Sequence, residues 1–447
     1  MDVDVLVAGA GAAGLAAALA AAQRGATVVL VDANPAFRDG CNTVQSTSMI
    51  PAGGSRWQRA AGVADTPERF HADVLRKTGG QADPTVASAL TRVAPALVEW
   101  LADDCGVALE LVTDFDYPGH SRPRCHSVPD RSGRTLHQRL LAAASADERI
   151  ELVVPRRLAG VTLHDGSIAA ELAAPDGRGE SVRAGAVVLA TSGFGASPEL
   201  VRRHLPEIAD GLYFGGDGAV GDALAIGESL GADVGCLDAY QGHGSVAVPH
   251  GVLMTWAAIM HGGVLVNARG ERFGDESAGY SEFARAVLDQ PGAEAWMVFD
   301  ERIADACRSF ADFRRALEAG AVRGAAGIDE LARLVGAPSA ALARTLAQAG
   351  PGDRLGRTSW EQPLSPPYRA VRVTGALFHT QGGLRVDADA AVLRGGRPIR
   401  GLYAAGGAAV GMSGHGAAGY LAGNGLLAAL GLGMIAGRRV GVAGAVR

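Results

Sequence analysis

Three glycines near the start of the chain, Gly9, Gly11 and Gly14, stand between an apolar run and a run of alanines. This spacing allows a tight turn at Gly9, a close approach of backbone N–H groups to a pyrophosphate at Gly11, and close helix packing at Gly14. A second apolar run over residues 28–31 ends in Asp32, whose carboxylate can accept hydrogen bonds from both hydroxyls of an adenosine ribose. These residues predict a dinucleotide-binding site.

The elements that must position these residues are a strand over residues 5–8, a helix over about residues 11–24 and a strand over residues 28–31. The helix would direct its N-terminal dipole at the phosphates. Two segments far away in the sequence also have the pattern of an apolar strand that ends in small residues. They lie over residues 184–191 and over residues 399–406, and the second closes into another glycine turn. We therefore expect both ends of the chain to build one nucleotide-binding fold.

Composition changes in the middle of the chain, where charged residues are more frequent. We expect an α/β fold with a Rossmann-type domain formed by residues 1–238 and 375–447, and an inserted α+β capping domain formed by residues 239–374. Within the insert, the apolar spacing predicts a helix near residues 282–288 and a helix pair across residues 328–347.

The formal net charge of the 447 residues is −6, with acidic and basic residues mixed, so nucleic-acid binding is not indicated. The five cysteines are dispersed without CxxC or CxxCH, which argues against a metal site, an iron–sulfur cluster or attached haem and suits a cytoplasmic protein. Residues 417–437 are uncharged and long enough to span a bilayer. They contain six glycines and Asn424, so we expect a buried helix there and no membrane span.

Three further segments carry a family resemblance. Residues 263–276 fit the pattern G-x-LVN-x-x-G-x-RF-x-x-E, residues 377–384 contain H-T-x-GG, and residues 401–406 are followed by the glycines at 423 and 425. Together these segments cover the chain almost from end to end. It resembles the flavoprotein family of fumarate reductase, succinate dehydrogenase and 3-ketosteroid Δ1-dehydrogenase.

The resemblance implies FAD as the cofactor and a mobile cap that closes over the substrate. Some members of this family tether FAD to a histidine, but residues 40–46 contain none, so we expect noncovalent FAD. Electrons would pass to a quinone, O₂ or another protein acceptor. The residues expected to contact FAD are Gly9, Gly11, Ala13, Gly14, Asp32, Ala33, Asn42, Thr43, Ala190, Thr191, Gly193, Asp217, Gly406, Gly423, Asn424 and Leu426.

The resemblance also exposes a departure in the substrate site. Fumarate reductases have an arginine four residues after the glutamate of RF-x-x-E, which donates a proton, and another just before the distal glycines, which clamps a carboxylate. This chain has Tyr280 and Tyr420 at those positions. Because arginine holds a carboxylate with two parallel hydrogen bonds, a site that lacks both arginines is poorly suited to fumarate or succinate.

The segment from Glu276 to Tyr280 resembles the E-S-x-x-Y of ketosteroid dehydrogenases, in which the tyrosine takes the α-proton. Tyr280 is therefore expected to transfer the proton, and Tyr420 to hydrogen-bond the substrate carbonyl. The steroid enzymes place their carbonyl-binding tyrosine nearer to Ala417, so this second assignment is inexact. The alternative for either tyrosine is simple packing against the pocket.

Six further polar residues are candidates for the substrate site. His379 aligns with a substrate-binding histidine of fumarate reductases, His243 stands at their H-P-T segment, and His415 is similar to a G-H stretch of the steroid enzymes. In the loop over residues 114–126, Tyr117 and Arg122 are expected to meet a carbonyl or carboxylate at the pocket mouth, as is Arg124. The alternatives are structural roles, such as fixing a turn, a hinge or a loop salt bridge.

These features predict an FAD-dependent desaturase that forms a C=C bond next to a carbonyl in a cyclic or hydrophobic ketone. A hydride would leave the β-carbon for flavin N5 while a base takes the α-proton, whose acidity depends on hydrogen bonds to the carbonyl oxygen. The same site run backwards is a reductase of activated alkenes. An amine or hydroxyl oxidase and a flavin-binding protein without turnover are further alternatives.

Overall fold

The computed structural model describes residues 2–114 and 117–440. Its larger sheet has the strand order β19-β20-β9-β1-β2-β6, in which β20, β9, β1, β2 and β6 pair with one another in parallel and β19 pairs with β20 antiparallel. Strands from the beginning and end of the chain therefore lie side by side, as the sequence predicts. Their bounds are β1 Asp2–Ala8, β2 Val28–Val31, β6 Ile150–Val153, β9 Gly179–Leu189, β19 Ala391–Arg394 and β20 Arg397–Ala404.

Two helices cross beside this sheet in close contact, α1 (Ala12–Ala22) and α16 (Asn424–Arg439). A Cβ added at Gly433 would lie 2.3 Å from the carbonyl oxygen of Ala13, and one added at Gly437 would lie 2.3 Å from that of Ala17. The glycines of α16 thus allow backbone-to-backbone packing, which accounts for the glycine-rich, uncharged sequence of this helix up to residue 437. Over the described residues, no helix is long and apolar enough to cross a membrane.

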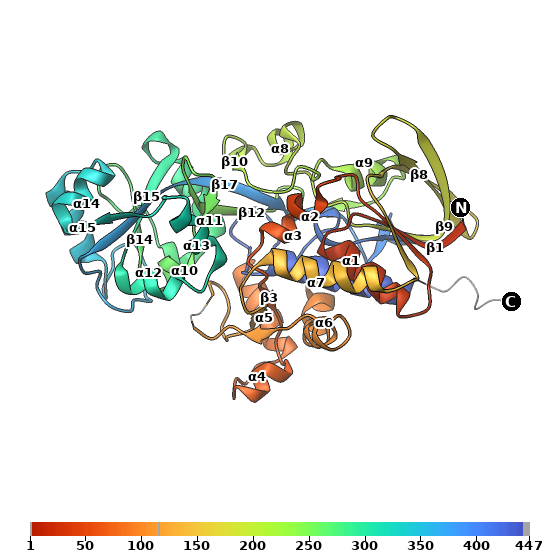
Figure 1. The fold of residues 1–447 in the computed structure, drawn as a ribbon, viewed down its shortest axis with the longest axis horizontal. Coiled ribbons are helices and arrows are strands. Elements are labelled where there is room, and N and C mark those ends of the chain that lie inside the picture. Colours follow the sequence, from red (N-terminus) through yellow and green to blue (C-terminus); the bar gives the residue numbers. More distant parts are fainter. Residues whose placement is uncertain (1, 115–116, 441–447) are drawn as a thin grey trace.

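A second sheet of order β13-β12-β17-β15-β14 forms the other lobe of the molecule (Figure 1). The short strands β10 and β16 also pair with β17, which is the longest strand of this sheet. The bounds are β10 Leu212–Tyr213, β12 Tyr240–Ala247, β13 Val252–Leu253, β14 Val264–Val266, β15 Glu294–Asp300, β16 Arg323–Ala325 and β17 Tyr368–Thr380.

Helices pack on this second sheet where the sequence predicts them. The stretch near residues 282–288 is α11 (Tyr280–Leu288), and the predicted helix pair is α14 (Ile328–Val335) with α15 (Ser339–Gln348). Three shorter helices complete the lobe, α10 (Ala257–Met260), α12 (Glu301–Cys307) and α13 (Ala311–Glu318).

The strand β17 connects the two lobes, as Figure 1 shows in blue. Its first half pairs with β15 of the second lobe, and its last residues, Phe378 and His379, lie beside the nucleotide-binding lobe. The β12–β17 pairing runs antiparallel with two register shifts, one after Gln241 and one after His243. This strand pair carries side chains of the insert to the region between the lobes.

The remaining segments of the nucleotide-binding lobe are short or lie at its periphery. Between β2 and β6 these are α2 Phe37–Gly40, α3 Asn42–Gln45, β3 Ile50–Pro51, α4 Arg56–Ala60, α5 Pro67–Lys77, α6 Pro84–Asp103, β4 Glu110–Leu111, β5 Cys125–Ser127 and α7 Gly133–Ala146. After β6 they are β7 Arg157–His164, β8 Ser167–Ala173, α8 Pro198–His204, α9 Asp222–Ser229, β11 Val234–Gly235 and β18 Gly383–Leu384.

Candidate active site

The glycine turn after β1 admits no side chain at two of its three glycines. Gly9 has a φ of +108°, and a Cβ there would lie 2.2 Å from the carbonyl oxygen of Ala190. A Cβ at Gly14 would lie 1.7 Å from the carbonyl oxygen of Gly9. At Gly11 the nearest atom to an added Cβ is Oγ1 of Thr43, at 3.5 Å, so that position is open and faces a cavity.

One elongated cavity runs from this turn to the strands of the second lobe. Twelve of the sixteen residues predicted to contact a cofactor line it, while Gly14, Gly193, Asp217 and Asn424 do not. Gly14 acts in packing, as its spacing predicts, and Asp217 is exposed. The lining residues among the predictions are Gly9, Gly11, Ala13, Asp32, Ala33, Asn42, Thr43, Ala190, Thr191, Gly406, Gly423 and Leu426.

The carboxylate of Asp32 is held by backbone amides at the end of β2. Ala10 N donates to one carboxylate oxygen at 2.7 Å, and Asn34 N donates to the other at 2.8 Å. Burial raises the pKa of Asp32, while these two hydrogen bonds oppose the rise. Each carboxylate oxygen keeps a further acceptor site, so the group can still receive ribose hydroxyls.

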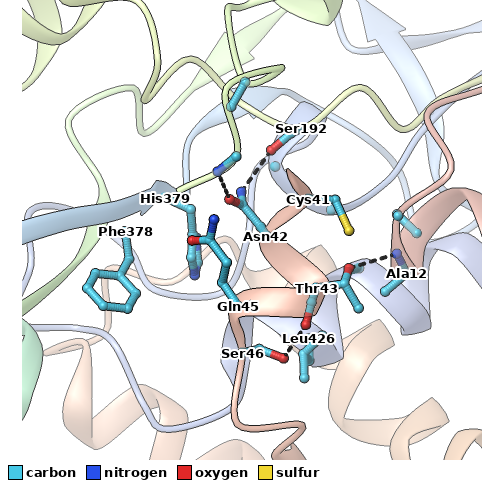
Figure 2. Close-up of a pocket in the computed structure, with 18 of the residues that line it drawn as sticks. Ala12, Cys41, Asn42, Thr43, Gln45, Ser46, Ser192, Phe378, His379 and Leu426 are labelled. Atoms are coloured by element: carbon cyan, nitrogen blue, oxygen red, sulfur yellow. Dashed lines mark hydrogen bonds between the residues drawn. The ribbon is translucent and has the colours of Figure 1, made fainter. Parts of the chain in front are cut away.

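The short helix α3 ties the glycine turn to two other loops of the cavity (Figure 2). Oγ1 of Thr43 accepts a hydrogen bond from Ala12 N at 2.9 Å. The side chain of Asn42 donates to Oγ of Ser192 at 3.1 Å and accepts from Gly216 N at 2.6 Å. These contacts fix the backbone amides around the middle of the cavity before any ligand is present.

Two buried polar atoms on the cavity wall have no hydrogen-bond partner among the described residues, Oγ1 of Thr191 and Oε1 of Gln45. A buried polar atom without a partner costs about 1–3 kcal/mol, so such atoms mark places where a polar ligand belongs. Figure 2 shows the Gln45 amide between Asn42 and His379. No motif in the sequence singles out Gln45.

At the far end of the cavity, two tyrosines and two histidines converge. The rings of Tyr280 and Tyr420 are 5.9 Å apart between centroids and inclined at 62°. His243 stacks on Tyr280, with centroids 4.6 Å apart at 19°, and His379 lies edge-on to Tyr420 at 5.8 Å. All four side chains line the cavity together with Trp256 and Phe378, two aromatic residues that sequence reasoning missed.

Tyr280 is placed by a buried ion-pair network just before it in the chain. It is the first residue of α11 and follows Gly279, whose φ of +152° is unfavourable for other residues. Upstream, the fully buried Glu276 receives two hydrogen bonds from Arg272, at 2.8 and 2.6 Å. Arg272 in turn donates to Asp353 at 2.9 Å, so the turn carrying Tyr280 is tied to a distant loop of the same lobe.

Tyr420 comes from the loop before α16, in the nucleotide-binding lobe. Its hydroxyl oxygen accepts a hydrogen bond from Gly425 N at 3.3 Å. A Cβ added at Gly425 would lie 2.7 Å from Nε2 of His379, so only glycine lets the amide, the phenol and the imidazole meet. The amide therefore holds the phenol oxygen in place, and the phenol offers its hydroxyl as a hydrogen-bond donor.

Burial keeps all four of these side chains neutral near pH 7. It raises the pKa of Tyr280 and of Tyr420 above the usual value of tyrosine, and it lowers the pKa of His243 to about 3 and that of His379 to about 4. The carboxylates and guanidiniums that line the cavity stand at its nucleotide end, near β2 and β7; within the described part of the chain they are Asp32, Arg156, Arg157 and Asp222.

The structure does not bring every predicted substrate residue to this end. Tyr117 lines the cavity, but Arg122 is exposed and donates to the carbonyl oxygen of Ser121. His415 is exposed and contacts Asp238 at 2.7 Å, and Arg124 is buried in ion pairs with two aspartates of the same lobe. These polar loop residues are bonded to neighbouring protein groups. They therefore have the structural role, such as a loop salt bridge, that was the alternative to substrate binding.

The described residues contain no group of histidine, cysteine, aspartate or glutamate side chains that could hold a metal ion. Their cavity instead fits a dinucleotide. The glycine turn excludes side chains, α3 presents fixed amides, and the unpartnered atoms of Thr191 and Gln45 await polar groups of a ligand. The fold and the site therefore define a flavin-type dinucleotide-binding oxidoreductase.

Comparison with known proteins agrees with this class. A family model described as an FAD binding domain matches residues 4–426, and the chain belongs to that family. Fumarate reductase (cytochrome) of Shewanella frigidimarina is 29% identical over 97% of this chain and 76% of its own length. The cofactor is FAD, and the protein is an FAD-dependent oxidoreductase of the class that acts on CH–CH bonds.

Two solved structures share the whole fold. The open conformation of a flavocytochrome c3 fumarate reductase superposes with a TM-score of 0.79 at 29% identity, covering 98% of this chain and 78% of that one. The 3-ketosteroid-Δ4-(5α)-dehydrogenase from Rhodococcus jostii RHA1, in complex with 4-androstene-3,17-dione, superposes with a TM-score of 0.74 at 26% identity, covering 98% and 96%. The prediction of a family shared by fumarate reductases and ketosteroid dehydrogenases is confirmed.

Proposed function

We propose that the protein is a desaturase that introduces a C=C bond next to the carbonyl of a cyclic or hydrophobic ketone. The observation that carries this proposal is that Tyr280 and Tyr420 lie close together at one end of the cavity, whereas the charged residues that line the cavity lie at its nucleotide end. A dicarboxylate buried there would lack a cationic partner, and an unpaired buried charge is strongly unfavourable. A neutral ketone meets no such penalty.

The carbonyl oxygen of the substrate is held by the hydroxyl group of Tyr420. In the structure the backbone N–H of Gly425 donates to the phenol oxygen at 3.3 Å, which holds the phenol in place and makes its hydroxyl a better donor. When a carbonyl oxygen accepts from this hydroxyl, negative charge that develops on it is stabilised, and the neighbouring α-proton becomes more acidic. A donor held in place before the reaction needs no rearrangement during it.

Tyr280 accepts the α-proton. Its phenol lies on the insert side of the cavity and Tyr420 lies on the nucleotide-binding side, so a substrate between them offers its carbonyl to one and its α-carbon to the other. A neutral phenol cannot accept a proton, so Tyr280 first releases its hydroxyl proton to water, a step that burial disfavours because it raises the pKa of this phenol. The phenolate then accepts the α-proton while negative charge develops on the carbonyl oxygen, and Tyr280 returns to the neutral phenol. FAD, when bound, supplies the acceptor for the β-hydride.

Residues 239–374 act as the substrate-capping domain in this proposal. They carry Tyr280 and His243, whereas residues 1–238 and 375–447 carry the FAD contacts, Tyr420 and His379. FAD is held without a covalent bond, since the segment around α2 and α3 has no histidine. Electrons leave the reduced cofactor for a quinone, O₂ or a protein acceptor.

The reverse reaction, reduction of an activated alkene, is the second candidate, because the fumarate reductase of Shewanella frigidimarina is a reductase by name. One experiment separates the two directions. Under anaerobic conditions, oxidised holoenzyme is mixed with saturated cyclic ketones and ketosteroids, and chemically reduced holoenzyme with the corresponding enones. Bleaching of FAD with formation of the conjugated enone, identified by NMR, supports the desaturase. Reoxidation by enones without any bleaching by ketones would support the reductase.

A further inference from the structure

The environment of His243 fixes which of its two ring nitrogens carries the proton. Oγ of Ser245 lies 2.7 Å from the carbonyl oxygen of Met254 and 2.9 Å from Nδ1 of His243. The carbonyl oxygen has no hydrogen of its own, so the single hydroxyl hydrogen of Ser245 must lie between the two oxygens. Oγ is then left as an acceptor, and Nδ1 of His243 must be the donor to it.

A neutral imidazole has one N–H, so Nε2 of His243 carries a lone pair. Burial keeps this ring neutral near pH 7, as the low pKa of His243 indicates. The ring lines the cavity, and its Nε2 has no hydrogen-bond partner among the described residues. The stacked ring of Tyr280 and the nearby ring of Phe378, with a centroid 5.1 Å away, hold the imidazole in this orientation.

The insert side of the cavity therefore presents an acceptor to the ligand, whereas the hydroxyl of Tyr420 presents a donor on the opposite side. We propose that His243 is a specificity-determining residue, and that the substrate carries a hydroxyl or N–H group that donates to Nε2 of His243. This inference rests on the proposed function, because it concerns a second contact to the same ketone. A carboxylate offers no hydrogen to this nitrogen, so the same residue also disfavours acidic substrates.

The test uses pairs of ligands that differ only in hydrogen-bond donation. One pair is a cyclohexanone with a hydroxyl opposite the carbonyl, and the same ring with a methoxy group there. A larger pair is dihydrotestosterone, which has a hydroxyl at the far end, and androstanedione, which has a keto group there. Binding to the oxidised holoenzyme is measured from the perturbation of the FAD spectrum, which does not require turnover.

The wild-type protein should bind the donor member of at least one pair about tenfold more tightly than its partner, as expected for one buried hydrogen bond. His243→Phe keeps the ring that stacks on Tyr280 but removes Nε2, and this preference should disappear. Ser245→Ala removes the oxygen that accepts from Nδ1–H of His243. The imidazole proton can then move to Nε2, so the preference for the donor ligand should vanish or reverse. Ser281→Ala is the matched control, because that buried serine accepts from Gly242 N and leaves the preference intact.

Two results would overturn the assignment: equal binding within both pairs by the wild type, or a donor preference that survives in His243→Phe. If no ketone binds, the proposed function fails, and the assignment of His243 is then tested by a measurement that needs no ligand. In ¹⁵N NMR of the holoenzyme, the His243 signals, identified by their loss in His243→Phe, should show a protonated Nδ1 and an unprotonated Nε2. The opposite tautomer would contradict the inference.

Discussion

Tyr280 and Tyr420 are separated along the chain by most of the insert and by the whole of β17, yet their rings lie 5.9 Å apart between centroids. One comes from α11 of the insert and the other from the loop before α16. Their contact exists only while the two lobes are held together, so the proposed chemistry depends on how the insert docks on the nucleotide-binding lobe. Separate substitutions can therefore test the two phenols, the FAD-binding glycine turn and the contact between the lobes.

Replacement of Tyr280 by phenylalanine should slow the anaerobic reduction of FAD by a ketone at least about 100-fold, the usual contribution of a general base. The cavity keeps its shape, because only the hydroxyl is lost, so FAD should remain bound. Rapid mixing with detection of the FAD absorbance measures the rate. Tyr403→Phe, in β20 and away from the cavity, is the control and should react like the wild type. A reduction rate unchanged in Tyr280→Phe would remove this residue from proton transfer.

Two alanine substitutions in the glycine turn should behave differently. At Gly14 an added Cβ would lie 1.7 Å from a backbone oxygen, so Gly14→Ala should unfold or misassemble the lobe. At Gly11 the nearest contact would be an ordinary 3.5 Å, so Gly11→Ala should fold with an unchanged circular dichroism spectrum. Its added methyl projects toward the cavity, and FAD titration of the apoprotein should show affinity about tenfold weaker or worse. Equal FAD affinity in a folded Gly11→Ala would place the pyrophosphate elsewhere.

The contact between lobes can be tested at Lys77 and Glu282. Nζ of Lys77, at the end of α5, donates to Oε1 of Glu282 at 2.7 Å and to the carbonyl oxygen of Ala278 at 2.8 Å, next to the turn that carries Tyr280. Lys77→Met should leave the carboxylate half-buried without a cation and destabilise the protein by about 2 kcal/mol in urea unfolding. Adding Glu282→Gln should recover part of this loss. If the double variant were as unstable as the sum of both single variants, the pair would not be coupled.

Acid should destabilise the protein through its buried histidines, and His126 is the clearest case. It is fully buried in β5, hydrogen-bonds Ser55 at 2.7 Å, and burial lowers its pKa to about 4 from the usual 6.5. Between these pH values the unfolded chain binds a proton that the folded chain does not. The free energy of unfolding should therefore fall as the pH drops from 6.5 toward 4, by up to about 1.4 kcal/mol per pH unit for each such histidine.

His126→Gln keeps a hydrogen-bonding side chain but cannot titrate, so its unfolding free energy should depend less steeply on pH over the same range. Urea unfolding at several pH values measures both slopes. Identical slopes in the variant and the wild type would show that His126 is protonated in the folded protein.

The nucleotide-binding half of the fold was predictable from sequence because its requirements are local. Gly9 is required by its positive φ and Gly14 by a contact with Gly9 in the same turn, and the spacing to Asp32 follows from a single strand-helix-strand unit. The presence of Tyr280 and Tyr420 in place of two arginines could be recognised by comparison with the family pattern. No spacing along the chain, however, implies that residues from different lobes are in contact. That relationship depends on β17 and on the docking of α11.

Other site residues could not be predicted for physical reasons. Gln45 stands out only because its Oε1 atom is buried without a partner, which is a property of the folded cavity. Arg122 and His415 looked functional as polar residues in loops, but exposed polar groups are readily satisfied by neighbours or water. The pair of His243 and Ser245 was also missed, because no strand was predicted at β12, the strand that places these two side chains within hydrogen-bond distance.

The central claim is that two phenols at the end of the cavity select a ketone over a dicarboxylate. The most direct measurement compares anaerobic reduction of the bound FAD by a panel of cyclic ketones and ketosteroids with its reduction by succinate, at equal concentrations and with one preparation of holoenzyme. We predict that at least one ketone bleaches FAD rapidly and that succinate leaves it oxidised. Rapid bleaching by succinate, with none by the ketones, would contradict the account.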